Sequence, residues 1–526
     1  MIVTWKGLLL TLVHSVAAIR GANSRRDPPL FDLLDDQRPL ARHLEELGPG
    51  FKQTFNFSAT ENRTMFGART AISADGTVVA LAGDGFVEVY EQVSGDSFDD
   101  WRLRAVRIAT TSGTLPKAID LSPDGMIVAI GQPDWNSARG RTDIYAYNTT
   151  DNTWTDIGSW SGSDPNYKVG YSLAFHKPAP NALGHYGNGD TLALGIPGFE
   201  LVGDPGFEYP LGEVYLLFRN QTSGRYFLSE EVRGKSLTGS ADQGRVDFLA
   251  FGSTVALGGT GEYVLAVGID TFNTELRPGR VVVLVSPLNT EGQFNLLGSE
   301  IVGEGGGDGF GSSIALNQFG TIIAIGGPLN DGRNFIMAGH VEVYSYKRGL
   351  DEFWVQLGGD IDGFTFNEQF GFSVALDYDG DTLLIGAPFF GGGTTGFGDD
   401  AGYATVLEYN RNSDAWFFVQ INRDENPLTL EGSEGSRLGH GVAMSANGAK
   451  LLVGIPFGTN QQGVVSGTAE LWQNTMYPTF SPINNRLPEY NPNGSGSLAG
   501  GVYWVTSNVS RAWNSGVAFI QSVFGV

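Results

Sequence analysis

The clearest copy of a repeated pattern runs from residue 370 to residue 388. It begins Phe370-Gly371-Phe372-Ser373-Val374-Ala375-Leu376, turns through an Asp/Gly segment and ends Leu383-Leu384-Ile385-Gly386-Ala387-Pro388. Two short apolar runs joined by an Asp/Gly turn are typical of a hairpin of buried β-strands. This stretch therefore predicts two neighbouring strands of a larger sheet.

The same hairpin recurs along the chain, and seven copies can be found. Each copy continues into a third strand, such as Val341-Glu342-Val343-Tyr344, and fourth strands are marked by Trp101, Trp154, Phe294, Trp354 and Trp416. The Gly that ends each second strand gives a period near sixty residues: Gly83, Gly131, Gly195, Gly268, Gly326, Gly386 and Gly454. Four strands per copy at this period predict an all-β, seven-bladed β-propeller of four-stranded blades.

The seventh copy has no clear fourth strand of its own. After Trp472 the chain becomes rich in Pro, which cannot sustain a strand ladder. The segment from Phe51 to Ser58 lies just before the first copy, where a fourth strand normally precedes the next blade. We expect this N-terminal strand to pair with blade seven and close the ring, because closure removes an exposed sheet edge. The predicted propeller then covers residues 51–473.

Composition agrees with a turn-rich β protein and limits the partners. The 526 residues include 75 Gly and 23 Pro, and charged residues make up 17 %. The formal net charge of −24 would repel nucleic acid and anionic lipid over most of the surface. Cys is absent, which excludes disulfides, thiolate metal sites and cysteine nucleophiles.

The two ends of the chain lie outside the repeats. Residues 1–22 combine Lys6, an apolar run and small residues, which predicts a secretory signal peptide; a short buried helix is the alternative. Residues 23–50 form a leader in which Pro39 could open a short helix. Residues 474–526 form a Pro/Gly/Ser/Asn-rich tail whose weakly apolar end is too short to span a bilayer. We therefore expect a secreted or extracellular-surface protein without a strong membrane segment.

Sequons for N-glycosylation give weak support for export. They begin at Asn56, Asn62, Asn148, Asn220, Asn493 and Asn508. The tripeptide also arises by chance in a chain rich in Asn, Ser and Thr. Glycosylation is expected first at the four sequons within or near the predicted blades, Asn56, Asn62, Asn148 and Asn220.

The motifs Phe370-Gly371 and Gly386-Ala387-Pro388, with degenerate forms such as Gly326-Gly327-Pro328, carry a family resemblance. The chain resembles FG-GAP repeat proteins, best known from the seven-bladed propeller at the N-terminus of integrin α subunits. The resemblance covers the predicted blades and implies the same fold, with cell adhesion as one function among several. Propellers also host lectins and enzymes, so the resemblance is specific for fold rather than function.

In integrin-like blades the turn between strands one and two commonly holds Ca²⁺ through Asp and Asn oxygens. One turn here comes close, with Asp377, Asp379 and Asp381 at alternate positions, although the later acidic ligand falls on Ile385. We expect one or two Ca²⁺ sites at most, and an ordinary hairpin turn is the alternative. The His residues show no metal-ligand spacing and are interpreted as structural or solvated.

Blade geometry predicts which loops share a face. Loops from strand two to three and crossovers from strand four to the next strand one emerge on the same side. The loops hold aromatic and acidic candidates for a binding face: Trp135, Phe199, Tyr209, Phe272, Phe389, Phe390, Asp399 and Asp400. The crossovers add Glu304, Asp308, Asp360 and Asp362. Aromatic rings among acids suit recognition of a protein or saccharide. The alternative is that the rings fold inward and fill the loops.

These observations favour a secreted or cell-surface binding or adhesion module that recognises a protein or glycan through this face. A secreted carbohydrate-active enzyme, a hydrolase or lyase on the same scaffold, is the alternative. No Gly-x-Ser-x-Gly elbow or phosphate-binding loop is present in the sequence, and no catalytic residue can be named. The ligand and the oligomeric state are not predicted.

Overall fold

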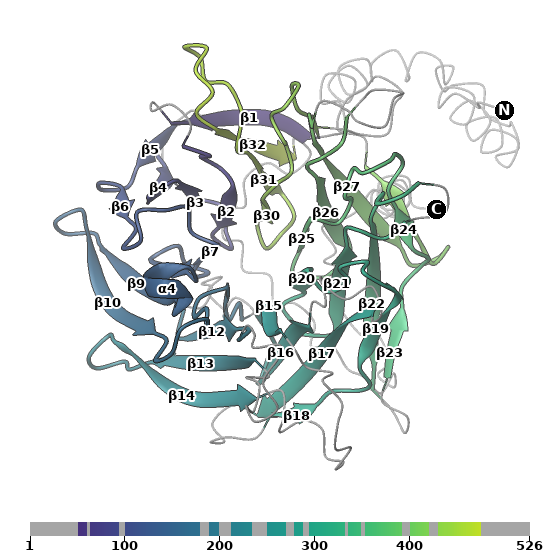
Figure 1. The fold of residues 1–526 in the computed structure, drawn as a ribbon, viewed down its shortest axis with the longest axis horizontal. Helices are drawn as coiled ribbons and strands as arrows, with labels where there is room; N and C mark the ends of the chain where they lie inside the picture. The colour runs from purple at the N-terminus through teal and green to yellow at the C-terminus, as the bar shows by residue number, and fades with distance from the viewer. Residues whose placement is uncertain are drawn as a thin grey trace, which may run out of the picture. The chain divides into compact units, whose positions relative to one another are not determined.

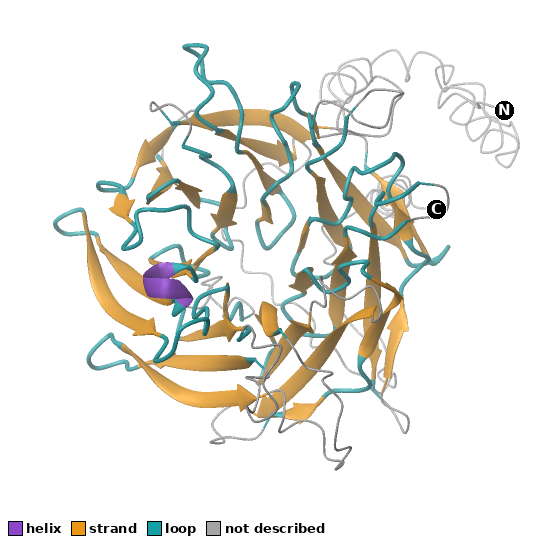
Figure 2. Cartoon of the chain, viewed as in Figure 1, coloured by secondary structure: helices purple, strands orange, loops and turns teal. Residues whose placement is uncertain are grey.

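The computed structural model describes residues 51–59, 64–93, 100–178, 189–198, 212–233, 250–269, 278–287, 294–331, 335–348, 353–391, 400–419 and 430–474. Within them, seven antiparallel sheets of four or five strands follow one another around a common axis (Figure 1). The described part contains one short helix, α4 (Trp135–Ala138) (Figure 2). The prediction of an all-β, seven-bladed propeller is confirmed.

Blades one to six run from an innermost strand to an outer strand in chain order, and blade seven takes its outer strand from the N-terminus. Blades one to three contain β2 (Arg69–Ile72), β3 (Val78–Gly83), β4 (Phe86–Gln92), β5 (Trp101–Leu103) and β6 (Ile108–Ala109); β7 (Ala118–Leu121), β8 (Ile127–Gln132), β9 (Arg141–Asn148) and β10 (Thr153–Ser161); β11 (Ser172–Phe175), β12 (Thr191–Ile196), β13 (Glu213–Arg219) and β14 (Tyr226–Arg233). Blades four and five contain β15 (Phe251–Gly258), β16 (Glu262–Ile269), β17 (Pro278–Pro287), β18 (Asn295–Leu296) and β19 (Ile301–Gly306); β20 (Ser313–Leu316), β21 (Ile322–Gly327), β22 (His340–Lys347), β23 (Phe353–Gln356) and β24 (Ile361–Asp362). Blades six and seven contain β25 (Ser373–Leu376), β26 (Thr382–Ala387), β27 (Tyr403–Asn410), β28 (Ala415–Phe418) and β29 (Leu430–Glu431); β30 (Val442–Met444), β31 (Lys450–Ile455), β32 (Thr468–Asn474) and β1 (Phe51–Ser58).

Blade seven is completed by the N-terminal strand, as the sequence predicts. Its sheet has the order β1-β32-β31-β30, with β1 antiparallel to β32 and Phe57 opposite Ala469. Phe57 is buried and contacts the rings of Tyr90 and Trp101 in blade one. The strand therefore pairs with the outer edge of β32 and also packs between the last blade and the first. The predicted signal peptide and leader, and the tail beyond Asn474, lie outside the described residues.

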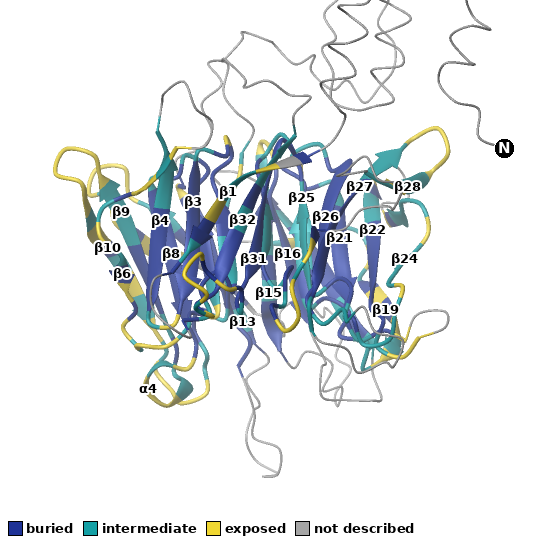
Figure 3. Ribbon diagram, turned by 90° about the horizontal axis from the view of Figure 1, so that it is seen from above, coloured by how far each residue is buried: buried dark blue, intermediate teal, exposed yellow. Residues whose placement is uncertain are grey.

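The core consists of the contacts between neighbouring blades. Second strands such as β26 are buried along their whole length because a blade packs on each face. Figure 3 shows this burial through the middle of the blades, with exposed residues at loop tips and along outer strands. Each fully buried Leu or Ile side chain contributes about 1.5–3 kcal/mol, so the stability of the ring is spread over all its seams.

The repeated Gly has a steric cause. A Cβ on Gly386 would lie 2.0 Å from the carbonyl oxygen of Gly439, which opens the next blade. The same carbonyl accepts a hydrogen bond of 2.8 Å from the Ser373 hydroxyl. Only Gly lets the two backbones approach this closely. Blade one differs, because its register places Ala82, rather than the marker Gly83, at this position.

Candidate functional site

Backbone hydrogen bonds in blade six place loop and crossover on one face. The Phe389 N–H, in the loop after strand two, donates to the carbonyl of Glu368 in the crossover before the blade. The Arg437 N–H, in the next crossover, donates to the carbonyl of Asp400 over 2.9 Å. We call the side on which these segments emerge the loop face.

The predicted aromatic residues divide into two groups. Phe390 lies edge-on to the Tyr403 ring, with 5.0 Å between ring centroids, and packs against the core of blade six. Trp135 is half-buried in α4, with the guanidinium of Arg141 5.5 Å from its ring centroid. These two rings therefore fill space near their own blades. Four further predicted residues lie outside the described part of the chain: Phe199, Tyr209, Phe272 and Asp399.

Phe389 and Asp400 instead meet a cation. The Arg437 guanidinium lies 4.7 Å from the Phe389 ring centroid and forms an ion pair of 2.8 Å with Asp400. It also lies 5.2 Å from the Phe457 ring centroid. The ring and the acid predicted for the binding face are thus joined through an Arg whose side chain is 34 % exposed.

A continuous row of side chains extends from this point across the neighbouring blades. The Phe372 ring contacts Phe389 and then His440, with centroid distances of 5.9 and 4.9 Å. His440 Nδ1 lies 3.1 Å from an Arg69 guanidinium nitrogen. Arg69 Nε donates to the carbonyl of Lys117 over 2.6 Å.

The row ends in blade three at a Tyr flanked by two Lys. The Nζ atoms of Lys117 and Lys168 lie 4.9 and 6.0 Å from the Tyr171 ring centroid. We call the whole row the rim cluster, because it follows the inner ends of the blades: Arg69, Lys117, Lys168, Tyr171, Phe372, Phe389, Arg437 and His440. It gathers four cations on a chain whose net charge is −24.

The rim cluster holds its His neutral. Burial, and then the charges of Arg69, Lys117 and Arg437, lower the pKa of His440 to about 3. Burial also lowers the pKa of Arg69, to about 10, so Arg69 still carries its charge at pH 7. The cationic character therefore comes from the Arg and Lys side chains, while His440 acts as a neutral spacer between aromatic and guanidinium groups.

Alignment of the repeats would have predicted part of the rim cluster. Four of its residues occupy the same position of four repeats, directly after the Gly or Pro of the opening motif: Lys117, Tyr171, Phe372 and His440. Equivalent positions of a propeller meet around its axis, so aligning the copies brings these residues together. Nothing in their local spacing does so, since Arg69 and His440 are 371 residues apart.

The turn predicted for Ca²⁺ does gather buried carboxylates. Asp377 and Asp381 are almost wholly buried, and Asp377 Oδ1 accepts the backbone N–H groups of Gly380, Asp381 and Thr382 at 2.9–3.1 Å. Burial and the charge of Asp381 raise the pKa of Asp377 well above its usual range. Ser73 accepts equivalent backbone bonds in blade one, so Asp377 also has a purely structural task. This geometry is compatible with one ion through the remaining carboxylate oxygens.

A second group of carboxylates joins blades four and five. Oxygens of Glu304, Glu342 and Asp360 lie within 4.8 Å of one another. Glu304 is on β19, Glu342 is on β22 and Asp360 directly precedes β24. The sequence predicts Glu304 and Asp360 on the loop face as crossover residues, whereas Glu342 belongs to a predicted third strand.

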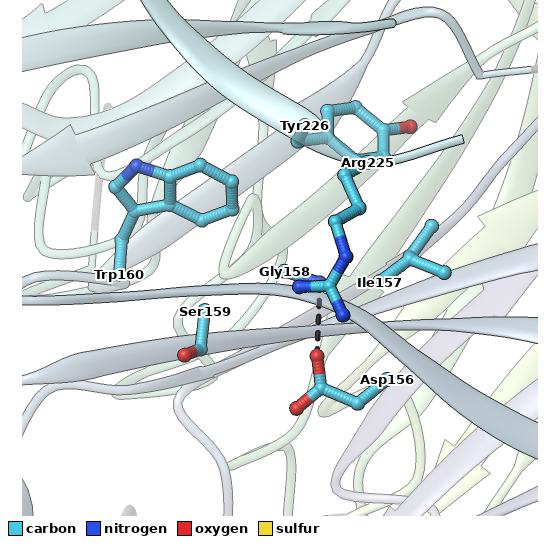
Figure 4. Close-up of a pocket in the computed structure, with 7 residues that line it drawn as sticks. All are labelled: Asp156, Ile157, Gly158, Ser159, Trp160, Arg225 and Tyr226. Carbon is cyan, nitrogen blue, oxygen red and sulfur yellow. Dashed lines mark hydrogen bonds between the residues drawn. The ribbon is translucent and has the colours of Figure 1, made fainter. Parts of the chain in front are cut away.

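A depression between the outer strands of blades two and three was not predicted. It is lined by Asp156, Ile157, Gly158, Ser159, Trp160, Arg225 and Tyr226 (Figure 4). The Asp156 carboxylate accepts the Gly158 N–H over 2.9 Å at a bulge of β10, and Tyr226 is buried. The wall thus combines strand backbone and the apolar side chains of Ile157 and Trp160 with the polar side chains of Asp156 and Arg225.

Three of the four sequons nearest the blades fall within the described residues. Asn56, on the edge strand β1, and Asn148 and Asn220, at turns between third and fourth strands, are exposed. Turns of that kind lie opposite the loop face in a blade of alternating strands. Asn62 lies outside the described residues.

Comparison with known proteins adds no assignment. No family model matches the chain, and a search of curated proteins finds no match. Across the described ranges, the one helix is far too short to cross a membrane.

Proposed function

We propose that the protein is an extracellular binding module that recognises a negatively charged group of a protein or saccharide at the rim cluster. The observation that carries this proposal is the gathering of Arg69, Lys117, Lys168 and Arg437 on one face of an acidic chain. Cations concentrated against an opposite background attract and orient an anionic ligand. The neighbouring rings supply contact area at a low cost in side-chain entropy.

The arrangement favours binding over catalysis. Within the rim cluster, His440 has a pKa of about 3, and Asp400, the acid that contacts the cluster through Arg437, is held in an ion pair. A general base with a pKa near neutrality is what hydrolysis of a saccharide or ester would need. We therefore propose retention of the ligand without turnover.

The FG-GAP resemblance, export and glycosylation belong to the same proposal. A seven-bladed ring with Phe-Gly at the start of blades and Gly at the ends of second strands supports kinship with FG-GAP propellers such as those of integrins. Glycans on Asn148 and Asn220 would project from the side opposite the rim cluster and leave it accessible. We further propose that the turn of Asp377, Asp379 and Asp381 binds Ca²⁺.

Binding to panels of carboxylated, sulfated and neutral polysaccharides, and of acidic and neutral peptides, tests the proposal. We expect retention of acidic ligands that weakens with salt, because exposed charges are screened over about 8 Å at physiological ionic strength. Lys117→Glu should weaken binding about tenfold, equal to about 1.4 kcal/mol. It leaves intact the Lys117 backbone carbonyl that Arg69 uses.

Arg411→Glu is the matched control, because it makes the same change of charge at an exposed turn between β27 and β28 on the opposite side. Equal losses in both variants would show that net charge, not the rim, governs binding. Preference for neutral ligands would contradict the proposal, and product release from a polysaccharide would favour the enzyme alternative.

A further inference from the structure

The seam between blades four and five contains polar atoms that the described protein does not satisfy. His340 is 1 % exposed and Glu342 is 4 % exposed. His340 Nε2 and Glu342 Oε1 have no hydrogen-bond partner, and they face each other at 3.7 Å. A buried polar atom without a partner costs about 1–3 kcal/mol, so two that converge on one point indicate a missing group.

The charges around this point have one sign. Glu304 and Asp360 bring their carboxylates to within 4.8 Å of Glu342. Within the described residues, no Lys or Arg forms an ion pair with any of the three. Burial, together with the charges of Asp360, Glu304 and Asp308, raises the pKa of Glu342 to about 7. Among the described residues, the seam therefore concentrates negative charge without a Lys or Arg paired to offset it.

Blade one shows what normally fills this position. Glu88 and Tyr90 occupy the places of Glu342 and Tyr344, and in both blades the Tyr hydroxyl donates to the Glu. In blade one, Arg107 forms an ion pair of 3.1 Å with Glu88. The strand pairings Val87 with Ile108 and Val341 with Ile361 show that Asp360 stands in the place of Arg107.

The other blades with an acid at this place also supply partners. Asp143 in blade two receives Arg141 at 2.7 Å and the Gln132 amide at 2.9 Å. Glu470 in blade seven accepts the Trp472 indole N–H at 3.0 Å. Blade five therefore differs from blade one by replacing a cation with a further carboxylate.

We propose that a divalent cation binds in the seam between blades four and five, held by the carboxylates of Glu304, Glu342 and Asp360, which lie within 4.8 Å of one another. His340 Nε2, which lies 3.7 Å from Glu342 Oε1, moves in as a fourth ligand when the ion binds. The ion takes the place that the Arg107 guanidinium occupies in blade one. It neutralises the carboxylates, and Nε2 gains a partner. Glu304, the exposed member, leaves a route by which the ion can enter.

The donor set selects the kind of ion. Carboxylates suit Mg²⁺, Ca²⁺ and Mn²⁺, whereas an imidazole nitrogen favours Zn²⁺ and other transition metals. Three carboxylates with one imidazole therefore fit Mn²⁺ or Zn²⁺ better than Ca²⁺ or Mg²⁺. The site is distinct from the turn of Asp377, which offers oxygen ligands alone.

Titration of the chelator-treated full chain with Mn²⁺, followed by the loss of the free-ion electron paramagnetic resonance signal, tests the site. We expect one Mn²⁺ to bind and Zn²⁺ to compete for it. Asp360→Asn and Glu342→Gln should each weaken binding by more than about tenfold, because each removes a charged ligand. Asp379→Ala, which alters the other carboxylate turn, should leave this Mn²⁺ bound.

Asp360→Arg provides a test that does not depend on the folding of the other variants, because it places an Arg where blade one has Arg107. It restores the blade-one arrangement, so we expect no Mn²⁺ binding and a melting temperature above that of the metal-free parent. The proposal is overturned by equal Mn²⁺ affinity in Asp360→Arg and the parent, by loss of Mn²⁺ in Asp379→Ala instead, or by tighter binding of Ca²⁺ than of Mn²⁺. Absence of Mn²⁺ and Zn²⁺ binding by the parent would show that His340 and Glu342 form a simple ion pair.

Discussion

Blades one and five share a scaffold but offset their buried charge in different ways. Both place a Glu and a Tyr on the third strand and bury a Phe from the opening Phe-Gly, with Phe66 in one and Phe310 in the other. Blade one adds Arg107 over the Phe86 ring, whereas blade five has Asp360 and His340 at these places. In blade one the Arg neutralises the buried Glu within the protein, whereas blade five relies on an external cation. The two blades differ in two side chains and share the same strand pairing.

The largest loss of stability should follow removal of the buried Phe that opens each blade, and it should be the same in blades one and five. Phe66→Ala and Phe310→Ala each remove a fully buried ring, and we expect each to cost about 3–5 kcal/mol of unfolding free energy. Denaturant unfolding of the two variants measures the costs. Similar values would show that the seams pack alike; a difference of several kcal/mol would mean that the blades are not equivalent and would weaken the comparison.

Arg107→Asp should reproduce the charge pattern of blade five in blade one. It leaves Glu88 buried beside another carboxylate, and we expect a loss of about 2 kcal/mol, reduced from the value for fully buried pairs because Arg107 is 37 % exposed. Chemical denaturation with chelator present gives the value. Arg102→Asp is the control, since that Arg is 68 % exposed and Glu91 keeps Arg104. A loss no larger than the control's would remove the role assigned to Arg107.

His340→Phe gives blade five the residue that blade one has at the equivalent position, Phe86. We expect the metal-free protein to gain about 1 kcal/mol, because a buried nitrogen without a partner is replaced by an apolar edge. Mn²⁺ affinity should fall in the same variant. The reverse exchange, Phe86→His, should destabilise blade one by a similar amount, and thermal melts of both variants provide the measurement. A destabilised His340→Phe protein would show that the imidazole already has a favourable environment.

A fall in pH should destabilise the rim cluster through His440. Folding lowers the pKa of His440 from 6.5 to about 3, with Arg69, Lys117 and Arg437 facing it. The unfolded chain therefore binds a proton first, so the stability is full above pH 6.5 and declines as the pH falls toward 3. Between pH 6.5 and 5.5 the contribution of His440 to this loss should be about 1 kcal/mol. His440→Gln should flatten this part of the stability curve, and an unchanged slope would contradict the assignment.

The fold was predictable because propeller blades repeat a local hairpin whose markers have steric causes. Gly386 is required by the carbonyl of Gly439, and the apolar second strands follow from burial on both faces. The fourth strand of blade three, β14, was not predicted, because the aromatic residue that begins it, Tyr226, is neither a Trp nor a Phe as in the other marked blades. Such a strand pairs only along one edge, so its sequence is less constrained.

The candidate sites were predictable only in part, because ring closure assembles them. Phe389 and Asp400 could be placed on the loop face from strand direction, but Arg437 reaches them from the next crossover. Glu304 and Asp360 were placed on that face as separate acids. Their convergence on Glu342 depends on the packing of blade four against blade five, which no local spacing encodes.

The closing strand β1 also determines when the ring can be completed during synthesis. Thr54, on this strand, donates a hydrogen bond to the carbonyl of Leu471, 417 residues later. At about 5–20 residues per second, the ribosome needs roughly 20–80 s to make the intervening chain. Throughout that time β1 has no strand partner, and Phe57 lacks the part of its contacts that blade seven provides. An unpaired strand edge recruits other strands. The pairing of β1 with β32 is therefore the last contact of the ring to form and the point where nascent chains are most exposed to aggregation.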